Sequence, residues 1–268
     1  GSANSPAAAS RWANSPPAAE TMRPPELQGV IRRRMLVNFR ADPGVVRRLL
    51  PAPFKPKRHA GHALVGICLI RLEAIRPTGW PVWCGLSSEN AAHRIAVEWE
   101  EDGERREGVF IPRRHTGSRL NQLAGGRIFP GEHLAANFRV DDTGGNLRLR
   151  MQAKDGRTTV AVVGKETDAL PADSCFASLA DSSAFFAAGS VGYSANHCGS
   201  RADGLELATA QWTVRPLQVE EVTSSFFDDP SVFPAGSIRF DHALIMRDIP
   251  HRWRALPEIA LGAPGCGV

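Results

Sequence analysis

The chain has 268 residues, of which 43% are hydrophobic, so it is long enough to bury a substantial core in one large domain or two small ones. Its formal net charge of +4 is mild, and acidic residues are interspersed with basic ones, which argues against the concentrated basic face of a nucleic-acid-binding protein. The 25 glycines and 20 prolines are spread along the chain and favour many turns and short strands over long helices.

Residues 1–27 are rich in Ala, Ser, Pro and Asn, and they begin with a Gly-Ser pair that is typical of a cleaved tag. This composition predicts an extended or disordered tail, and we expect residues 28–268 to form a single domain. Residues 35–39 predict the first strand. Asp42 and Pro43 then predict the N-cap and the first position of a short helix.

The middle of the chain reads mainly as strands. Residues 63–75 form a long apolar stretch without helical caps and predict a buried strand. Residues 95–99 alternate between apolar and polar, and a Gly-containing turn returns the chain through residues 107–111, which predicts a hairpin. Residues 117–124 predict a short helix.

The next segment predicts three strands at residues 134–140, 147–153 and 158–163, with tight turns between them, so we expect an antiparallel meander. Residues 174–188 give the clearest helical pattern. A long polar loop is expected over residues 189–204.

Three further strands are predicted at residues 205–212, 218–226 and 236–246. The sum is about ten strands and three or four short helices. We therefore expect an α+β domain in which a large antiparallel sheet or closed β-barrel carries a few short external helices.

Several short motifs carry a resemblance to a known family. They are Phe39-Arg40-Ala41-Asp42, Leu49-Leu50-Pro51-Ala52-Pro53-Phe54, Gly85-Leu86-Ser87-Ser88-Glu89, Phe129-Pro130, Gly189-Ser190-Val191-Gly192-Tyr193, Ser224-Ser225-Phe226-Phe227-Asp228-Asp229 and Phe233-Pro234-Ala235-Gly236-Ser237. Together they resemble the acetoacetate decarboxylase-like superfamily, and the motifs beyond residue 165 look like its YqjF-like branch. The resemblance covers roughly residues 30–255.

In the decarboxylases of this superfamily, a lysine follows the Tyr-Pro or Phe-Pro pair and forms an imine with the substrate ketone. Here Gly131 takes the place of that lysine and Glu132 takes the place of its cationic neighbour. Glycine has no amine, and a carboxylate would raise the pKa of an incoming lysine. The resemblance therefore implies a pocket of this kind, with Phe129 against the ligand, but without imine chemistry.

Two other positions match residues that line the family's pocket. Arg32 aligns with a strand arginine that faces the substrate carboxylate, although Arg33 and Arg34 allow a slip in register. The alternative for Arg32 is a solvated strand edge. Glu89 aligns with a glutamate that takes part in acid/base work, and its alternative is to cap a turn. A second pocket glutamate falls on Cys68, for which a buried structural thiol is the expected role.

Glu132 and His133 place a carboxylate next to an imidazole where the family has its lysines. Such a pair offers a base that titrates near neutrality. Adjacent residues on a strand point to opposite faces, so we expect only one of the two to enter the pocket.

No metal is expected, because the eight histidines show no HExxH, HxH or Cys/His cluster, and no cofactor is implied. Five cysteines without a CxxC pair fit a reduced cytoplasm. No apolar run is long enough to cross a bilayer, so no membrane is expected as a partner. The basic end of the chain, at Arg247, His251, Arg252 and Trp253, either lines the barrel mouth or forms a contact in a homo-oligomer.

The leading hypothesis is a cytoplasmic protein that binds a small carboxylate or carbonyl compound in an enclosed pocket, with Arg32 and Phe129 as binding residues. As an enzyme it would be lyase-like, using Glu89 with Glu132 or His133 for acid/base chemistry without an imine. The alternative is a non-catalytic ligand binder or scaffold. A third possibility is a decarboxylase with a relocated lysine, Lys165.

Overall fold

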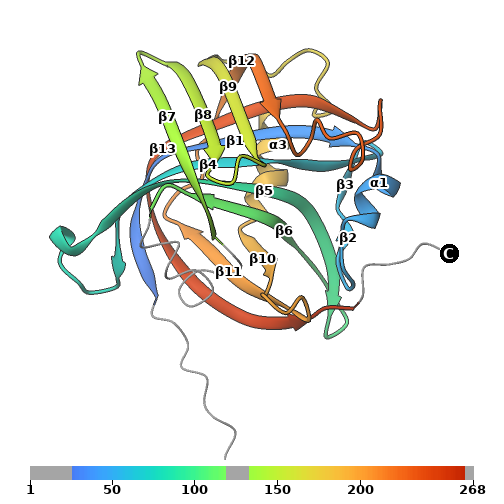
Figure 1. The fold of residues 1–268 in the computed structure, drawn as a ribbon, viewed down its shortest axis with the longest axis horizontal. Coiled ribbons are helices and arrows are strands. Elements are labelled where there is room, and N and C mark those ends of the chain that lie inside the picture. Colours follow the sequence, from blue (N-terminus) through green and yellow to red (C-terminus); the bar gives the residue numbers. More distant parts are fainter. Residues whose placement is uncertain (1–25, 119–132, 263–268) are drawn as a thin grey trace, which may run out of the picture.

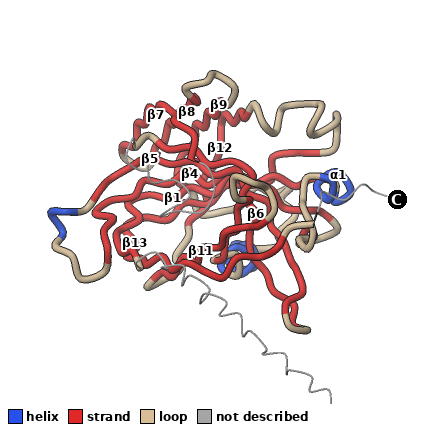
Figure 2. The backbone as a smooth tube through the Cα atoms, turned by 60° about the horizontal axis from the view of Figure 1, so that its bottom comes forward, coloured by secondary structure: helices blue, strands red, loops and turns tan. Residues whose placement is uncertain are grey.

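The computed structural model describes residues 26–118 and 133–262. Most of these residues lie in one sheet of thirteen strands, shown in red in Figure 2, with two short α-helices and one 3-10 helix, η1 (Val82–Cys84), beside it. The strands are β1 (Leu27–Ala41), β2 (Lys55–Pro56), β3 (Arg58–His59), β4 (His62–Pro77), β5 (Leu86–Glu101), β6 (Glu104–Thr116), β7 (His133–Thr143), β8 (Asn146–Ala153), β9 (Thr159–Glu166), β10 (Val191–Ala195), β11 (Arg201–Thr209), β12 (Arg215–Ser224) and β13 (Ile238–Ala260).

The strand pairings close into two rings that share β13, β1, β4, β5 and β6. The larger ring is completed by β7, β8, β9 and β12, and the smaller one by β10 and β11, which pair with β6 and β13 respectively. In Figure 1 the two sets of strands lie on opposite sides of the shared strands. The predicted large sheet that closes into a barrel is confirmed. Two of the described pairings, β6 with β7 and β6 with β10, are parallel.

The shared strands are buried on both faces, because successive side chains point to opposite sides of the sheet. Met35 and Leu69 lie in the core of the larger ring, whereas their neighbours Leu36 and Ile70 lie in a second core on the other face. This double burial explains why β4 reads as a nearly continuous apolar run. Phe176 and Phe186 cover part of the second core.

Helix α1 (Pro43–Arg48) begins where the sequence predicts. The Asp42 carboxylate accepts hydrogen bonds from the backbone N–H groups of Gly44 and Val45, at 2.7 and 2.9 Å. These bonds satisfy two of the donors that a helix leaves unpaired at its first turn. The predicted hairpin and the antiparallel meander of β7, β8 and β9 are likewise confirmed.

Helix α3 (Leu179–Ala187) is shorter than the predicted helix over residues 174–188. It begins after Ser178, whose hydroxyl accepts from the Asp181 N–H at 3.1 Å. The preceding turn is held elsewhere, because the backbone N–H of Cys175 donates to Asp241 at 2.9 Å. The expected helix over residues 117–124 lies almost entirely outside the described residues.

The prediction of one long loop over residues 189–204 is wrong, because β10 forms within this segment and pairs with β6 and β11. The final strand is also much longer than predicted. β1 pairs along one edge of β13, while β12 and β11 pair with successive parts of its other edge. Within the described residues, neither α-helix is long and apolar enough to span a membrane.

Candidate functional site

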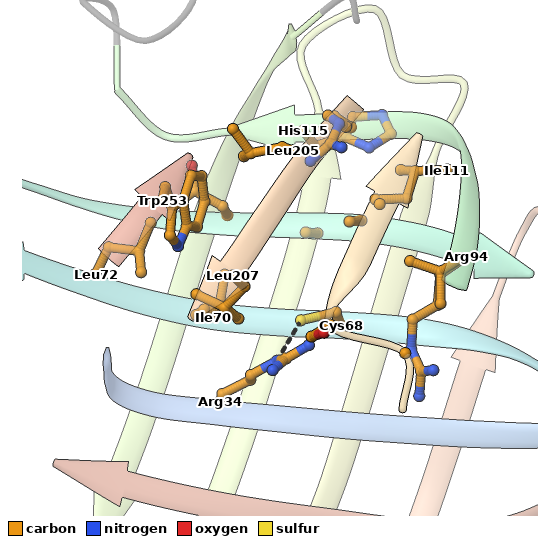
Figure 3. A pocket seen from close by; sticks show the side chains of 18 of the residues that line it. Arg34, Cys68, Ile70, Leu72, Arg94, Ile111, His115, Leu205, Leu207 and Trp253 are labelled. Atoms are coloured by element: carbon orange, nitrogen blue, oxygen red, sulfur yellow. Dashed lines mark hydrogen bonds between the residues drawn. The ribbon is translucent and has the colours of Figure 1, made fainter. Parts of the chain in front are cut away.

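A cavity of about 110 Å³ lies inside the smaller ring, between the shared strands and β10 and β11 (Figure 3). A buried water needs roughly 10–15 Å³ of such space, so the cavity accommodates several water-sized groups, or one small organic molecule. Its described walls are formed by Arg34, Cys68, Ile70, Leu72, Asn90, Ala91, Ala92, Arg94, Val109, Ile111, Arg114, His115, His133, Gly189, Ser190, Gly192, Leu205, Leu207 and Trp253.

Arg34 and Cys68 lie next to each other on one wall. The Arg34 Nε–H donates to the Cys68 Sγ at 3.3 Å, and the guanidinium lies 5.6 Å from the centre of the Trp212 ring. Figure 3 shows this contact on the adjacent strands β1 and β4. The Nη1 of Arg34 is buried without a hydrogen-bond partner among the described residues. A half-buried guanidinium with an unpaired buried nitrogen is suited to bind an anion.

Arg94 enters the wall from β5 and is only 5% exposed. Its Nη2 donates to the Asn38 side-chain oxygen, and its guanidinium lies 4.7 Å from the centre of the Phe186 ring. Burial lowers the pKa of Arg94 to about 10, so the side chain stays protonated at neutral pH. The neighbouring Arg34 charge lowers this pKa further.

Arg114 is the third cation and comes from β6. Its Nε–H donates to the Ser194 hydroxyl at 3.0 Å. Burial lowers the pKa of Arg114 to about 10 as well, which still leaves it charged at neutral pH. Three guanidiniums from three of the shared strands, β1, β5 and β6, therefore contribute to the same small cavity.

The remaining wall is mostly apolar, and within the described residues it contains neither a carboxylate nor a lysine. Leu205 and Leu207 of β11 lie across from Ile70 of β4, and Trp253 of β13 lies beside Leu72 in Figure 3. Trp253, at the basic end of the chain, thus lines the cavity, and the oligomer contact considered for that end stays a prediction. The cavity thus combines cationic hydrogen-bond donors with an apolar surface, as small-molecule sites commonly do.

Two histidines contribute to the lining. His115 is fully buried, and neither of its ring nitrogens has a hydrogen-bond partner among the described residues. Burial, together with the nearby charge of Arg113, lowers the pKa of His115 to about 4, so its imidazole is neutral at pH 7. His133, which the sequence predicted as a catalytic residue, begins β7 and also lines the cavity. Neutral imidazoles can accept a proton from a bound ligand.

The other predicted residues lie elsewhere. Arg32 is outside the cavity lining, with a side chain that is 54% exposed and paired with Glu73 and Asp248. Glu89 faces the opposite side of the sheet, where its carboxylate accepts from Arg33 at 2.7 Å. Phe129 and Glu132, together with Gly131, fall outside the described residues.

A β-bulge explains why Arg34 rather than Arg32 reaches the cavity. The register of β1 against β4 shifts between Ile31 and Arg33, so Arg32 has no partner in register on β4. Beyond the bulge, Arg34 pairs with Ile70, which pairs with Asn90, and this row lines the cavity.

Sequence reasoning missed Arg94, Arg114 and Asn90 as cavity residues. One signal was present, because residues 90, 92 and 94 alternate along a single strand and therefore share a face. The alternation does not say which face borders a cavity. The identity of that face depends on β10 and β11, which close the smaller ring from a distant part of the chain.

A second buried polar cluster lies behind Arg94. His242 Nδ1 contacts Asp241 Oδ2 at 2.6 Å, and His242 Nε2 contacts the Ser182 Oγ at 2.8 Å and the Asn38 Nδ2 at 3.1 Å. This has the connectivity of a Ser-His-Asp triad. Ser182 and His242 are fully buried and Asp241 is 2% exposed, so the hydroxyl does not face a substrate. We interpret the cluster as structural, because it fixes α3 against the sheet and orients Asn38.

The tautomer of His242 follows from these contacts. Arg94 donates to the Asn38 oxygen, so the Asn38 amide nitrogen faces His242 and can only donate to it. His242 Nε2 is therefore an acceptor, and its Nδ1–H donates to Asp241. No group of three or more His, Cys, Asp or Glu side chains in the part of the chain that the structure describes is arranged to hold a metal ion.

Residues 30–237 match the model of the DUF2071 family, which is described as an uncharacterized conserved protein. The chain belongs to the DUF2071 family. The search of curated proteins gave no match to this DUF2071 chain.

Solved structures place the DUF2071 chain in the acetoacetate decarboxylase-like fold, as the sequence motifs predicted. An acetoacetate decarboxylase from Legionella pneumophila is 13% identical with a TM-score of 0.52, covering 93% of this chain and 92% of that one. An acetoacetate decarboxylase-like enzyme from Sphingomonas wittichii is 12% identical with a TM-score of 0.55, covering 95% and 99%. The enduracididine biosynthesis enzyme MppR, complexed with pyruvate, is 12% identical with a TM-score of 0.55, covering 90% and 92%.

Proposed function

We propose that this protein binds a small carboxylic acid with a carbonyl group in the arginine-lined cavity, and acts on it by proton transfer without an imine. The observation that carries the proposal is the set of three guanidiniums around a cavity with an apolar wall: Arg94, which is buried, and Arg34 and Arg114, which are half-buried. Guanidiniums bind carboxylates through charge-assisted hydrogen bonds, and the apolar wall suits a short carbon chain. The pyruvate complex of MppR, which has the same fold, supports this ligand class.

The positions of the lysines argue against an imine. None of the four lysines lines the cavity, and all four lie within the described residues. Lys165, the candidate for a relocated nucleophile, is an exposed residue of β9. Lys57 forms an ion pair with Glu107 at 2.5 Å, and its ammonium group lies 4.1 Å from the centre of the Phe185 ring. An imine requires a neutral amine within bonding distance of the ligand carbonyl, and no described residue supplies one.

Proton transfer is the chemistry that the cavity residues support. A carboxylate held by Arg34 places the adjacent carbonyl carbon inside the cavity, and the guanidiniums stabilise negative charge that develops on the carbonyl oxygen during enolisation. The neutral imidazole of His115, or the imidazole of His133, is the candidate base for the carbon-bound proton. In this scheme the proton leaves carbon for the imidazole and returns to carbon from the same imidazole after exchange with water.

Arg34→Met should weaken the binding of pyruvate or acetoacetate by about 10- to 30-fold, because the ligand loses one guanidinium partner. Arg32→Met is the matched control. It removes an arginine two positions away whose contacts are to Glu73 and Asp248. Isothermal titration calorimetry on both variants gives the comparison. If Arg32→Met weakens binding and Arg34→Met does not, the assignment of the cavity as the ligand site is wrong.

Incubation of the protein with a keto acid in heavy water should speed deuterium incorporation at the carbon next to the carbonyl, which NMR detects. Sodium borohydride added to the same mixture should leave every lysine unmodified by mass spectrometry, because no lysine reaches the cavity. A reduced adduct on any lysine would overturn the proposal of imine-free chemistry. Binding without any exchange would instead identify the protein as a non-catalytic ligand binder.

A further inference from the structure

The arginines of this chain fall into two groups by their partners. Twelve arginines of the described residues form ion pairs with carboxylates, and most of these arginine side chains are exposed. Arg34, Arg94 and Arg114, which line the cavity, form none with a described carboxylate. Their side-chain hydrogen-bond partners among the described residues are neutral: a thiol, an amide oxygen and a hydroxyl.

Holding three guanidiniums, one buried and two half-buried, beside neutral partners is costly. A charge that is removed from water without a counter-charge loses several kcal/mol of solvation, even after the protein relaxes. The three charges also repel one another, as the effect of Arg34 on Arg94 shows. Proteins keep such a set where a bound anion supplies the compensating charge.

Cys68 lies in the same cavity wall as the three cations. Its sulfur accepts from the Arg34 Nε–H at 3.3 Å. Arg34 enters the wall from β1, Arg94 from β5 and Arg114 from β6. One carboxylate has only two oxygens and cannot accept paired hydrogen bonds from three guanidiniums at once.

We propose that the natural ligand of the cavity is a dianion, namely a short dicarboxylate, with one carboxylate bound by Arg34 and Arg94 and the other by Arg114. This rests on the proposed function and narrows its ligand class. A dicarboxylate fits better than phosphate or sulfate, because its carbons contact Ile70, Leu205 and Leu207, which line the wall between the polar groups. Two negative charges also compensate most of the three positive charges around the cavity.

Two pairs of ligands test the proposal by calorimetry. Malonate is compared with propionate, and succinate with butyrate, so that within each pair one methyl group becomes a second carboxylate. Each dicarboxylate should bind at least about tenfold more tightly than its partner, and this preference should shrink as salt rises. Equal affinity within both pairs would overturn the dianion inference and leave the proposed function standing. If no carboxylate binds, the proposed function itself fails.

Arg114→Met gives a second and independent readout. Loss of this guanidinium should bring malonate and propionate to within about threefold of each other, because only one carboxylate site remains. Arg113→Met is the control, since Arg113 does not line the cavity and its guanidinium lies 4.7 Å from the centre of the Phe226 ring. Thermal unfolding confirms that both variants are folded. A full malonate preference in Arg114→Met would contradict the assignment.

Discussion

The Asp241→Asn variant should lose about 2–4 kcal/mol of unfolding free energy. Asp241 Oδ1 accepts from the Cys175 N–H at 2.9 Å and from Arg40 at 3.0 Å, while Oδ2 accepts from Ser174 at 2.7 Å and from His242 at 2.6 Å. An asparagine has only one side-chain oxygen. Its NH₂ group would therefore face two donors and leave them without an acceptor.

Asp173→Asn is the matched control for this variant. Asp173 also contacts Arg40 and in addition contacts Arg239, but its side chain is 58% exposed. Exposed ion pairs contribute about 1 kcal/mol or less, so this variant should stay close to the parent protein. Urea unfolding followed by circular dichroism measures both. Equal losses in the two variants would show that burial does not decide the effect.

The Asp241 contribution should also depend on pH. Burial by itself would raise the pKa of Asp241, but hydrogen bonds from His242, Cys175 and Ser174 outweigh burial and hold the pKa well below its ordinary value of 3.8. The folded state therefore favours the ionised carboxylate. Its stabilisation is fully present above about pH 4 and decreases as the pH falls further. The stability gap between the parent and Asp241→Asn should accordingly shrink between pH 7 and about pH 3, and a constant gap would contradict this account.

Sequence reasoning succeeded where the cause of the structure is local. Helix α1 was predicted because Asp42 and Pro43 determine its first turn by themselves. The hairpin of β5 and β6 was predicted because alternation and a tight turn lie within one short stretch. The fold followed from the number of such strands, together with motifs that resemble a known family.

Sequence reasoning failed where a residue far away in the chain determines the local structure. The predicted helix over residues 174–188 starts late because Asp241, 66 positions beyond Cys175, holds the preceding turn. β10 was missed because its backbone partners belong to β6, far earlier in the chain. The cavity residues depend on both effects, since a bulge in β1 moves Arg32 out of register and only the closed ring shows which face borders a cavity.

The variant with the largest expected loss is Arg33→Met, at about 3–5 kcal/mol, because it removes one partner from a buried ionic cluster. The Arg33 side chain is 5% exposed and contacts Glu89 at 2.7 Å and Asp142 at 3.6 Å. Without Arg33, Glu89 is left as a carboxylate in a largely buried site. Arg247, which contacts Asp142 at 2.7 Å, still compensates that second carboxylate.

The pH dependence of Arg33→Met distinguishes this explanation from a simple packing defect. Burial raises the pKa of Glu89, and the attraction of Arg33 opposes that rise. Removal of Arg33 should raise the pKa further. A carboxyl group whose pKa is raised by folding contributes most to the stability of the folded protein at low pH. That contribution is lost as the pH rises through the folded pKa. The variant should therefore regain stability relative to the parent between pH 7 and about pH 5, whereas a packing defect would give the same loss at both.

Three consecutive arginines then differ in their measurable effects, because each faces a different environment. Arg32→Met should change stability by less than about 1 kcal/mol and leave ligand affinity unchanged, since the side chain is 54% exposed. Arg33→Met should lower stability without changing affinity, because Arg33 lies on the face opposite the cavity. Arg34→Met should lower affinity. If Arg33→Met weakened ligand binding at a pH where the protein stays folded, the ligand site would have to be moved to the larger ring, beside Glu89.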